Sequence, residues 1–364
     1  MSAEVPSWIS TARATLQNSS VDFFRVQPLR YWADFLLSIV LAYTAASIYM
    51  EAPAFSAIQV VAFLVAIFWL YRLGSLVHEV CHLGHREMRT FKVVWNLAVG
   101  VITLAPSPFY TRHHRDHHSQ RLYGTVYDPE YVINVFRPGS VLSLLGYAVL
   151  IAAYPLIVWL RFALAPLTFL HPKLREWALT RASSLTMNWR YERRLNAFDR
   201  WAVTTIELLC CLRAIAILAF VLAGVTHWSR IPLMYSLALG VLVLNQMRQL
   251  ADHHFVSDGG QMNLPDHIRD SCNYTSRDFF TWLFFPFSIR YHALHHLFPT
   301  LPYHNLKAAH NYLVEHLPAD SPYRQLDQPS WWSVARRTLW STPSLAAVAG
   351  PAVAEPTPAS TPST

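Results

Sequence analysis

The feature that most constrains this chain is a set of apolar segments, each about long enough to cross a lipid bilayer. A spanning helix needs about 20 consecutive, mostly apolar residues, and four segments approach that length with few charges: 31–50, 55–77, 208–225 and 231–247. Only 14% of the 364 residues are charged, whereas about 25% is usual for soluble domains. The sequence therefore predicts an all-α integral membrane protein with about four transmembrane helices.

The four segments fall into two pairs with short connections, which predicts two helical hairpins. The connection at residues 51–54 carries no Lys or Arg, whereas basic residues flank the other ends of both pairs, among them Arg25, Arg30, Arg86, Arg89, Lys92, Lys173, Arg175 and Arg200. Because cytoplasmic loops carry the excess of Lys and Arg, both hairpins are expected to begin and end in the cytoplasm. The formal net charge of +7 is assigned to these loops beside anionic lipid, and no nucleic acid is expected as a partner.

A fifth apolar stretch, residues 141–170, is long enough to cross but is interrupted by two prolines and one arginine. A crossing there would place the histidines before and after it on opposite sides of the membrane. If those histidines share one site, the stretch must lie in the interface or re-enter the membrane. Within the third span, Arg213 is expected to reach the interface, to pair with Glu207 or to face protein.

The chain is expected to form one membrane domain over residues 31–340, with a cytoplasmic segment at 1–30 and a disordered tail at 341–364. The start lacks the basic region and apolar core of a cleavable signal, so the first span should act as an uncleaved anchor. The tail is rich in Ala, Pro, Ser and Thr and cannot bury enough surface to order. Four irregularly spaced cysteines do not suggest a disulfide framework.

Three groups of spaced histidines carry the chemical information among the 18 histidines. The first, His78-Glu79-Val80-Cys81-His82, directly follows the second span. Residues four apart share one face of a helix, so His78 and His82 can bind one metal ion. His85 falls on the same face one turn further on, and is expected to contribute indirectly.

The second and third groups share the spacing H-x-x-H-H, which brings three imidazoles together on one side of a helix. Their members are His114, His117 and His118, and His292, His295 and His296. Eight imidazoles exceed the four ligands usual for one zinc ion, so two metal ions are indicated. All-nitrogen ligands with open positions favour iron in oxygen chemistry, although ligand type alone does not exclude zinc or copper.

Two other interpretations remain open. His78-Glu79-x-x-His82 also matches the H-E-x-x-H motif of zinc metalloproteases, but a protease leaves both H-x-x-H-H groups unexplained. A non-catalytic membrane protein that handles metal or haem would more often carry single histidines within its spans. Six histidines lack the spacing and are expected to be ordinary solvated or hydrogen-bonded residues: His171, His227, His267, His304, His310 and His316.

With these groups in place, the chain resembles the integral-membrane fatty acid desaturase superfamily from about Arg30 to His310. The order of hairpin, HxxxH, HxxHH, hairpin and HxxHH is that of the family. Further matching motifs are Asn96-Leu97, Gly100, Tyr123-Gly124-Thr125, Asp128-Pro129-Glu130 and His295-His296-Leu297-Phe298-Pro299. These motifs are shared by desaturases, hydroxylases, acetylenases and carotenoid-modifying enzymes.

The resemblance implies a ninth ligand, His253, in a segment Arg248-Gln249-Leu250-Ala251-Asp252-His253 after the fourth span; His254 beside it, like His113, stays ambiguous. It also implies two iron ions, oxygen as co-substrate, and a cytoplasmic helical cap that holds the site, with no catalytic residue apart from the metal ligands. Electrons are expected from a separate protein of ferredoxin or cytochrome b5 type, since no fused cytochrome b5-like HPGG segment is seen.

The resulting hypothesis is an oxygen-dependent oxidoreductase of the desaturase type, acting on an acyl chain bound to a lipid or a carrier. The alternative is hydroxylation of an acyl chain or carotenoid, because both outcomes use the same ligands and depend on how the reacting carbon is placed. Asp116, Asp128 and Glu130 are candidates for orienting imidazoles. Candidates for the walls of an acyl tunnel are Trp95, Phe109, Tyr110, Phe284, Phe285 and Phe287, and candidates for binding an anionic group are Arg112, Arg121, Arg248 and Arg290.

Overall fold

The computed structural model describes residues 7–341, and over that range the chain is helical, with isolated β-bridges and no strand. The predicted all-α class is therefore confirmed for this part of the chain. The predicted disordered tail lies outside the described residues except for its first residue.

Within residues 7–341, five helices are long and apolar enough to span a membrane. They are α2 (Pro28–Glu51), α3 (Ala57–His82), α6 (Val141–Ala163), α8 (Ala197–Leu222) and α9 (Arg230–Gln249). One of them, α6, covers most of the stretch at 141–170, and Pro155 lies inside it without ending it. Length and composition do not test whether four or five of these helices cross, but they show that the prolines of residues 141–170 do not prevent a long apolar helix.

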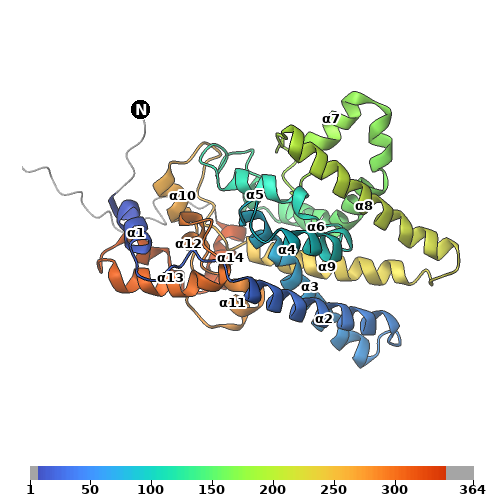
Figure 1. Ribbon diagram of the computed structural model, residues 1–364, viewed down its shortest axis with the longest axis horizontal. Coiled ribbons are helices and arrows are strands. Elements are labelled where there is room, and N and C mark those ends of the chain that lie inside the picture. The colour runs from blue at the N-terminus through green and yellow to red at the C-terminus, as the bar shows by residue number, and fades with distance from the viewer. Residues whose placement is uncertain (1–6, 342–364) are drawn as a thin grey trace, which may run out of the picture.

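The turns of the two predicted hairpins lie side by side. Helices α2 and α3 pack along each other, and Ser56 caps α3 by accepting a hydrogen bond from the backbone N–H of Gln59. Arg230, at the start of α9, donates to the carbonyl of Met50 and pairs with Glu51. In Figure 1 the four helices of the predicted hairpins, α2, α3, α8 and α9, extend to the right.

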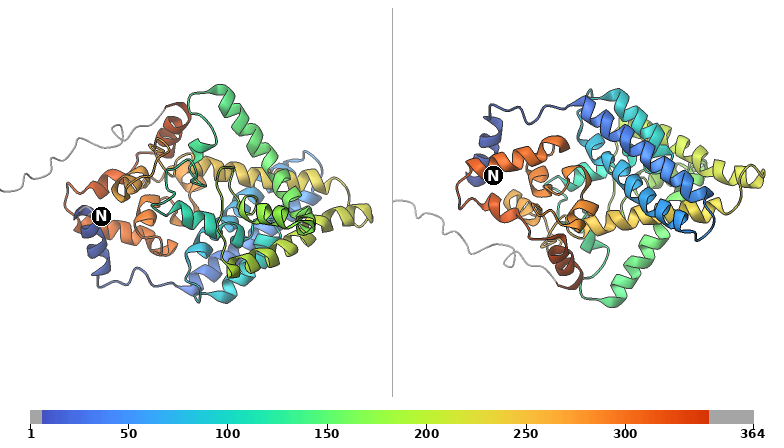
Figure 2. Two further views of the ribbon diagram at one scale, coloured as in Figure 1. Left: turned by 90° about the horizontal axis from the view of Figure 1, so that it is seen from above. Right: turned by 90° about the horizontal axis from the view of Figure 1, so that it is seen from below.

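Each end of α6 contacts a segment that is distant from it in the chain. Just before the helix, the Gly139 N–H donates to the Leu339 carbonyl of α14 (Trp331–Trp340) at 2.8 Å. In its last turn, the ring of Phe162 packs on Phe109, with centroids 5.0 Å apart, shortly before α5 (Thr111–His117). Figure 2 shows α6 running obliquely to α9.

A buried carboxylate ties α6 to α8. Glu207 of α8 is fully buried and pairs with Arg161 at 2.5 Å and with Arg175 of α7 (Pro172–Thr180) at 2.7 Å. Removing one partner of a buried ion pair is strongly destabilising, so this triad fixes α6 and α7 on α8. Of the three alternatives for Arg213, pairing with Glu207 is not the one seen, because Glu207 pairs with Arg161 and Arg175 and side chains six residues apart do not face each other on a helix.

Asn96 and Gly100, two of the motif residues, turn the chain back toward α5. They lie in the π-helix η1 (Asn96–Val101), which continues α4 (Arg89–Trp95). The Asn96 carboxamide accepts from the Ser107 N–H at 2.8 Å. A Cβ at Gly100 would lie 2.8 Å from the Cα of Pro106, so only glycine permits this close approach.

Several shorter helices lie toward the end of the molecule opposite the hairpin turns, whereas α7 lies away from them near α8 (Figure 1). Besides α5 and α14 they include α1 (Ser7–Gln17), α10 (Leu264–Asp270), α11 (Phe279–Phe284), α12 (His292–Leu297) and α13 (Tyr303–His316). Apolar side chains of α1, α3, α12 and α13 form one buried cluster. This packing joins the end of a span to the segments that carry the other histidines.

Candidate metal centre

The nine histidines predicted as ligands lie together as two adjacent groups. We call His78, His82, His114, His118 and His295 the five-histidine group, and His117, His253, His292 and His296 the four-histidine group. Within each group, the ring nitrogens that can bind a metal all lie within 4.8 Å of one another. Within residues 7–341, no other side chain belongs to either group.

Each H-x-x-H-H motif supplies both groups. In the second motif, His114 and His118 belong to the five-histidine group, whereas His117 belongs to the four-histidine group. The third motif is divided the other way, since His295 alone joins the five-histidine group. Residues four apart share a helix face, and the residue between them is turned aside, so one short helix can serve two sites.

The Nε2 atoms converge within each group. In the four-histidine group, the Nε2 of His253 lies 3.2 Å from that of His117 and 3.0 Å from that of His292. In the five-histidine group, the buried Nε2 atoms of His78 and His82 have no hydrogen-bond partner within the described residues. Converging lone pairs and unpartnered buried nitrogens are unfavourable without a cation between them, so this arrangement fits metal ions.

The two groups touch through His118. Its Nε2 lies 3.1 Å from those of His114 and His295. Its ring also stacks on that of His296, a member of the four-histidine group, at a centroid distance of 4.1 Å. Two ions bound in the two groups would therefore be close neighbours.

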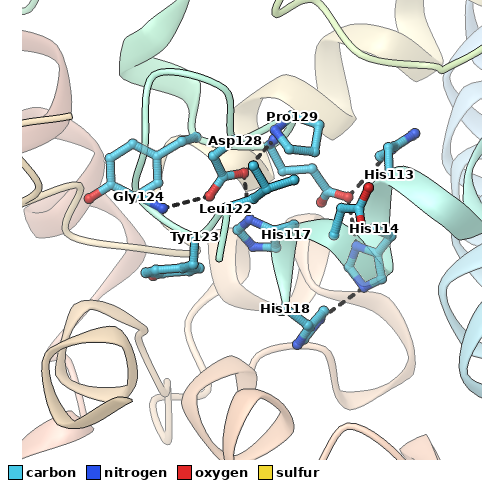
Figure 3. Close-up of polar contacts among 12 residues, drawn as sticks. His113, His114, His117, His118, Leu122, Tyr123, Gly124, Asp128 and Pro129 are labelled. Atoms are coloured by element: carbon cyan, nitrogen blue, oxygen red, sulfur yellow. Dashed lines mark hydrogen bonds and ion pairs between the residues drawn. The ribbon is translucent and has the colours of Figure 1, made fainter. Parts of the chain in front are cut away.

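Carboxylates hold the outer nitrogens of two of the histidines. The Nδ1 atoms of His114 and His117 lie 2.6 Å from Glu130 and 2.8 Å from Asp128 (Figure 3). A proton on Nδ1 that is shared with a carboxylate leaves the Nε2 lone pair free for a metal. The predicted contact of these two acids with imidazoles is confirmed, whereas Asp116 instead accepts a hydrogen bond from Tyr191 at 2.8 Å.

Burial keeps most of these imidazoles neutral, because desolvation penalises the charged form. It lowers the pKa well below the usual value for His114, His118, His253, His292, His295 and His296. At His117 burial also lowers the pKa, but the charge and hydrogen bond of Asp128 outweigh it, so the pKa is raised. Burial raises the pKa of Glu130 to about 7.

The three ambiguous histidines lie outside both groups. His85 is exposed. The Nδ1 of His113 contacts the Phe109 carbonyl at 3.1 Å, and the Nε2 of His254 lies 3.6 Å from the Sγ of Cys272. Of the adjacent pair after α9, the structure thus brings His253 to the group and leaves His254 out.

Glu79 does not have the surroundings of a protease base. Its side chain is buried, and Oε2 accepts hydrogen bonds from the Tyr31 hydroxyl at 2.9 Å and from the Tyr303 N–H at 3.1 Å. These bonds tie α2, α3 and α13 together. A general base must be free to take a proton from its reactant, so the geometry disfavours the metalloprotease interpretation.

The other candidates from the sequence lie mostly in packing or internal contacts. Tyr110 does reach the site, since its hydroxyl lies 2.9 Å from the Nδ1 of His114 and its ring stacks on the same imidazole. Five other aromatic residues are buried in the apolar clusters: Trp95, Phe109, Phe284, Phe285 and Phe287. Arg112 and Arg248 pair with Asp116 and Asp252, Arg290 donates to the Ser276 carbonyl, and Arg121 is exposed.

The expectation that His267 is an ordinary residue did not anticipate its contact with a predicted ligand. Its Nε2 lies 2.7 Å from the Nδ1 of His296, and its ring stacks on Tyr123 at 3.5 Å. The two histidines are 29 residues apart in the chain, so no helical spacing could have indicated the contact.

Comparison with known proteins identifies the family. The fatty acid desaturase family profile matches residues 54–327. The chain is also 36% identical, over 335 residues, to the ceramide hydroxylase of Caulobacter vibrioides (strain NA1000 / CB15N). This match covers 90% of this chain and 92% of that protein. No solved structure matches.

Apolar spanning helices and converging histidines, together with these matches, define an integral membrane oxidoreductase that acts on lipid. The chain belongs to the fatty acid desaturase family, a family of membrane di-iron enzymes. Of the two predicted reactions, the comparison favours the alternative, hydroxylation, over desaturation, because the similar protein is a hydroxylase. The motifs left this choice open, since both reactions use the same ligands.

Proposed function

We propose that this protein hydroxylates a ceramide-type membrane lipid, with oxygen as co-substrate and two iron ions bound by the nine histidines. The observation that carries the proposal is 36% identity to a ceramide hydroxylase over 90% of the chain. The identity extends well beyond the histidine motifs, and it favours a membrane lipid over a carrier-bound acyl chain.

The donor set fits two iron ions. Imidazole suits iron. We assign one ion to the five-histidine group and one to the four-histidine group. When bound and reduced, the iron supplies the activation of oxygen needed to attack an unactivated C–H bond. Nine histidines in two groups are more than one four-coordinate zinc ion can use.

The protein's own residues orient and shield the site. Asp128 and Glu130 accept the Nδ1 protons of His117 and His114, which fixes the direction of both rings. Seven of the nine histidines are buried, and the other two, His82 and His118, are partly exposed. The placement of the substrate carbon relative to this site then decides between hydroxylation and desaturation.

We further propose that α2, α3, α8 and α9 cross the membrane and that α6 lies in the interface or re-enters. The contacts of α6 with Leu339 at one end and Phe109 at the other support this topology, because Arg337 in the same helix as Leu339 lies 3.5 Å from His254, and the Phe109 carbonyl lies 3.1 Å from His113. Basic residues at the outer ends of the hairpins support a cytoplasmic orientation of that side. The electron donor is expected to be a separate protein of ferredoxin or cytochrome b5 type.

Cysteine labelling of intact cells tests the topology. Single cysteines at Arg121 and Thr300, both exposed near histidine motifs, should be protected from an impermeant reagent until the cells are opened. Cysteines at Pro53 and Trp228, in the two hairpin turns, should react in intact cells. Labelling of positions 121 and 300 from opposite faces would show that α6 crosses and would rule out the shared site.

Feeding experiments test the substrate. Expression in a host supplied with ceramides, phospholipids and free fatty acids should yield ceramides with one additional oxygen atom, detected by lipid mass spectrometry. The His118→Ala variant should yield none. Products confined to phospholipid or free fatty acids would contradict the ceramide assignment. Products that lack two hydrogen atoms would show that the reaction is desaturation and not hydroxylation.

A further inference from the structure

His267 is held rigidly beside the four-histidine group. It lies in the short helix α10, whose start is capped by Asn263 accepting from the Asp266 N–H at 2.9 Å. The side chain of His267 is 2% exposed. Its Nε2 lies 2.7 Å from the Nδ1 of His296, and its ring lies nearly parallel to that of Tyr123, with 20° between the planes.

The direction of the His267–His296 hydrogen bond follows from the use of Nε2 in the group. The Nε2 of His296 faces the Nε2 of His292 at 3.0 Å. If it presents a lone pair to a metal, the proton of His296 is on Nδ1 and is donated to the Nε2 of His267. His267 then carries its own proton on Nδ1.

Packing alone does not explain a histidine at this position. The Nδ1 of His267 is buried and has no hydrogen-bond partner within residues 7–341. A buried donor without a partner is unfavourable, and an apolar ring of similar shape would avoid that cost while stacking on Tyr123. The group that such a ring lacks is the Nε2 acceptor that faces His296.

Tyr123 extends the same support to a second member of the group. Its hydroxyl lies 2.8 Å from the Nδ1 of His253 and 2.6 Å from the Oδ2 of Asp270. Asp270 also accepts from the Tyr131 hydroxyl at 3.2 Å and from the Val256 N–H at 3.0 Å. One tyrosine therefore contacts both His253, through its hydroxyl, and His267, through its ring.

We propose that His267 is a positioning residue that accepts a hydrogen bond from His296 and thereby aims the Nε2 of that ring into the four-histidine group. This inference rests on the proposed metal site. Tyr123 links His253 to His296, because its hydroxyl contacts His253 and its ring stacks on His267. The Nδ1 atoms of His253 and His296 therefore face uncharged groups, Tyr123 and His267, whereas that of His117 faces the carboxylate of Asp128. The loss of His267 should therefore affect the metal of the four-histidine group and spare that of the five-histidine group.

Iron binding by the purified protein tests this role. His267→Phe keeps an aromatic ring but removes the acceptor, and should weaken iron binding at one of two positions by about 10- to 100-fold, the effect typical of groups that orient a ligand. Iron titration should then show one tight and one weak position, and Mössbauer spectra of the loaded variant should show a change in one of two iron environments. His267→Gln, whose side-chain carbonyl can accept a hydrogen bond, should have an intermediate affinity.

His310→Phe is the matched control. His310 is also buried and hydrogen-bonded, with its Nδ1 2.9 Å from the Tyr323 hydroxyl, but it lies outside both groups, so its variant should bind two irons as the wild type does. Wild-type affinity and spectra in His267→Phe would overturn the inference. Equal losses in His267→Phe and His267→Gln would also overturn it, since they would assign the effect to packing. A wild-type protein that binds no iron would instead overturn the proposed function, and this inference with it.

Discussion

Replacing His118 with alanine is expected to abolish product formation and to lower the iron content of the purified protein. The Nε2 of His118 lies 3.1 Å from those of His114 and His295, and its ring stacks on His296 of the other group. The variant would open a coordination position and remove the contact between the groups. We expect a loss of activity greater than about 100-fold, the upper range for groups that only orient a ligand, measured as hydroxylated lipid per amount of protein.

The same loss is expected for alanine at each of the other eight histidines: His78, His82, His114, His117, His253, His292, His295 and His296. His227→Ala is the control, because His227 is exposed in the turn between α8 and α9 and its variant should retain full activity. If His254→Ala were inactive while His253→Ala kept its iron, the ninth ligand would be His254 and not His253. Full activity in several of the nine variants would refute the di-iron site.

Removal of metal from the purified protein is expected to abolish activity, and ferrous iron should restore it. The restored protein should contain about two irons per chain, since the nine imidazoles form two groups and imidazole suits iron. Zinc is expected to bind the same nitrogens without restoring activity, because it has no redox chemistry. Activity with ferrous iron and metal content are measured on the same samples, with the His227→Ala protein as a reference.

One zinc ion and no iron, together with peptide hydrolysis that stops in Glu79→Gln, would favour the metalloprotease interpretation instead. The hydrogen bonds of Glu79 with Tyr31 and Tyr303 argue against that outcome.

The sequence indicated the candidate ligands because their spacing is local. His78 and His82, or His114 and His118, are four residues apart, and this distance alone places them on one helix face. The division of each H-x-x-H-H motif between two groups was not predicted, because it depends on how α3, α5 and α12 meet. His253 came only from the resemblance, since the ligand nearest to it in the chain is 39 residues away.

The features that the sequence did not indicate arise from contacts between segments that are distant in the chain. His267 meets His296 across 29 residues, and Arg161 and Arg175 meet Glu207 through the packing of α6 and α7 on α8. Composition did indicate that residues 141–170 are apolar, but not that they form the continuous helix α6 through Pro155. The choice between desaturation and hydroxylation depends on a substrate carbon that no motif in the chain encodes.

Insertion of oxygen into a ceramide-type lipid by this protein can be measured directly by running the reaction under isotopically labelled oxygen gas. The purified iron-loaded protein would be supplied with ceramide, an electron donor and 18O2, and the product analysed by mass spectrometry. We expect a ceramide that carries one labelled oxygen atom in a new hydroxyl group. A product that has lost two hydrogen atoms and gained no label, or a hydroxyl group with unlabelled oxygen, would contradict it.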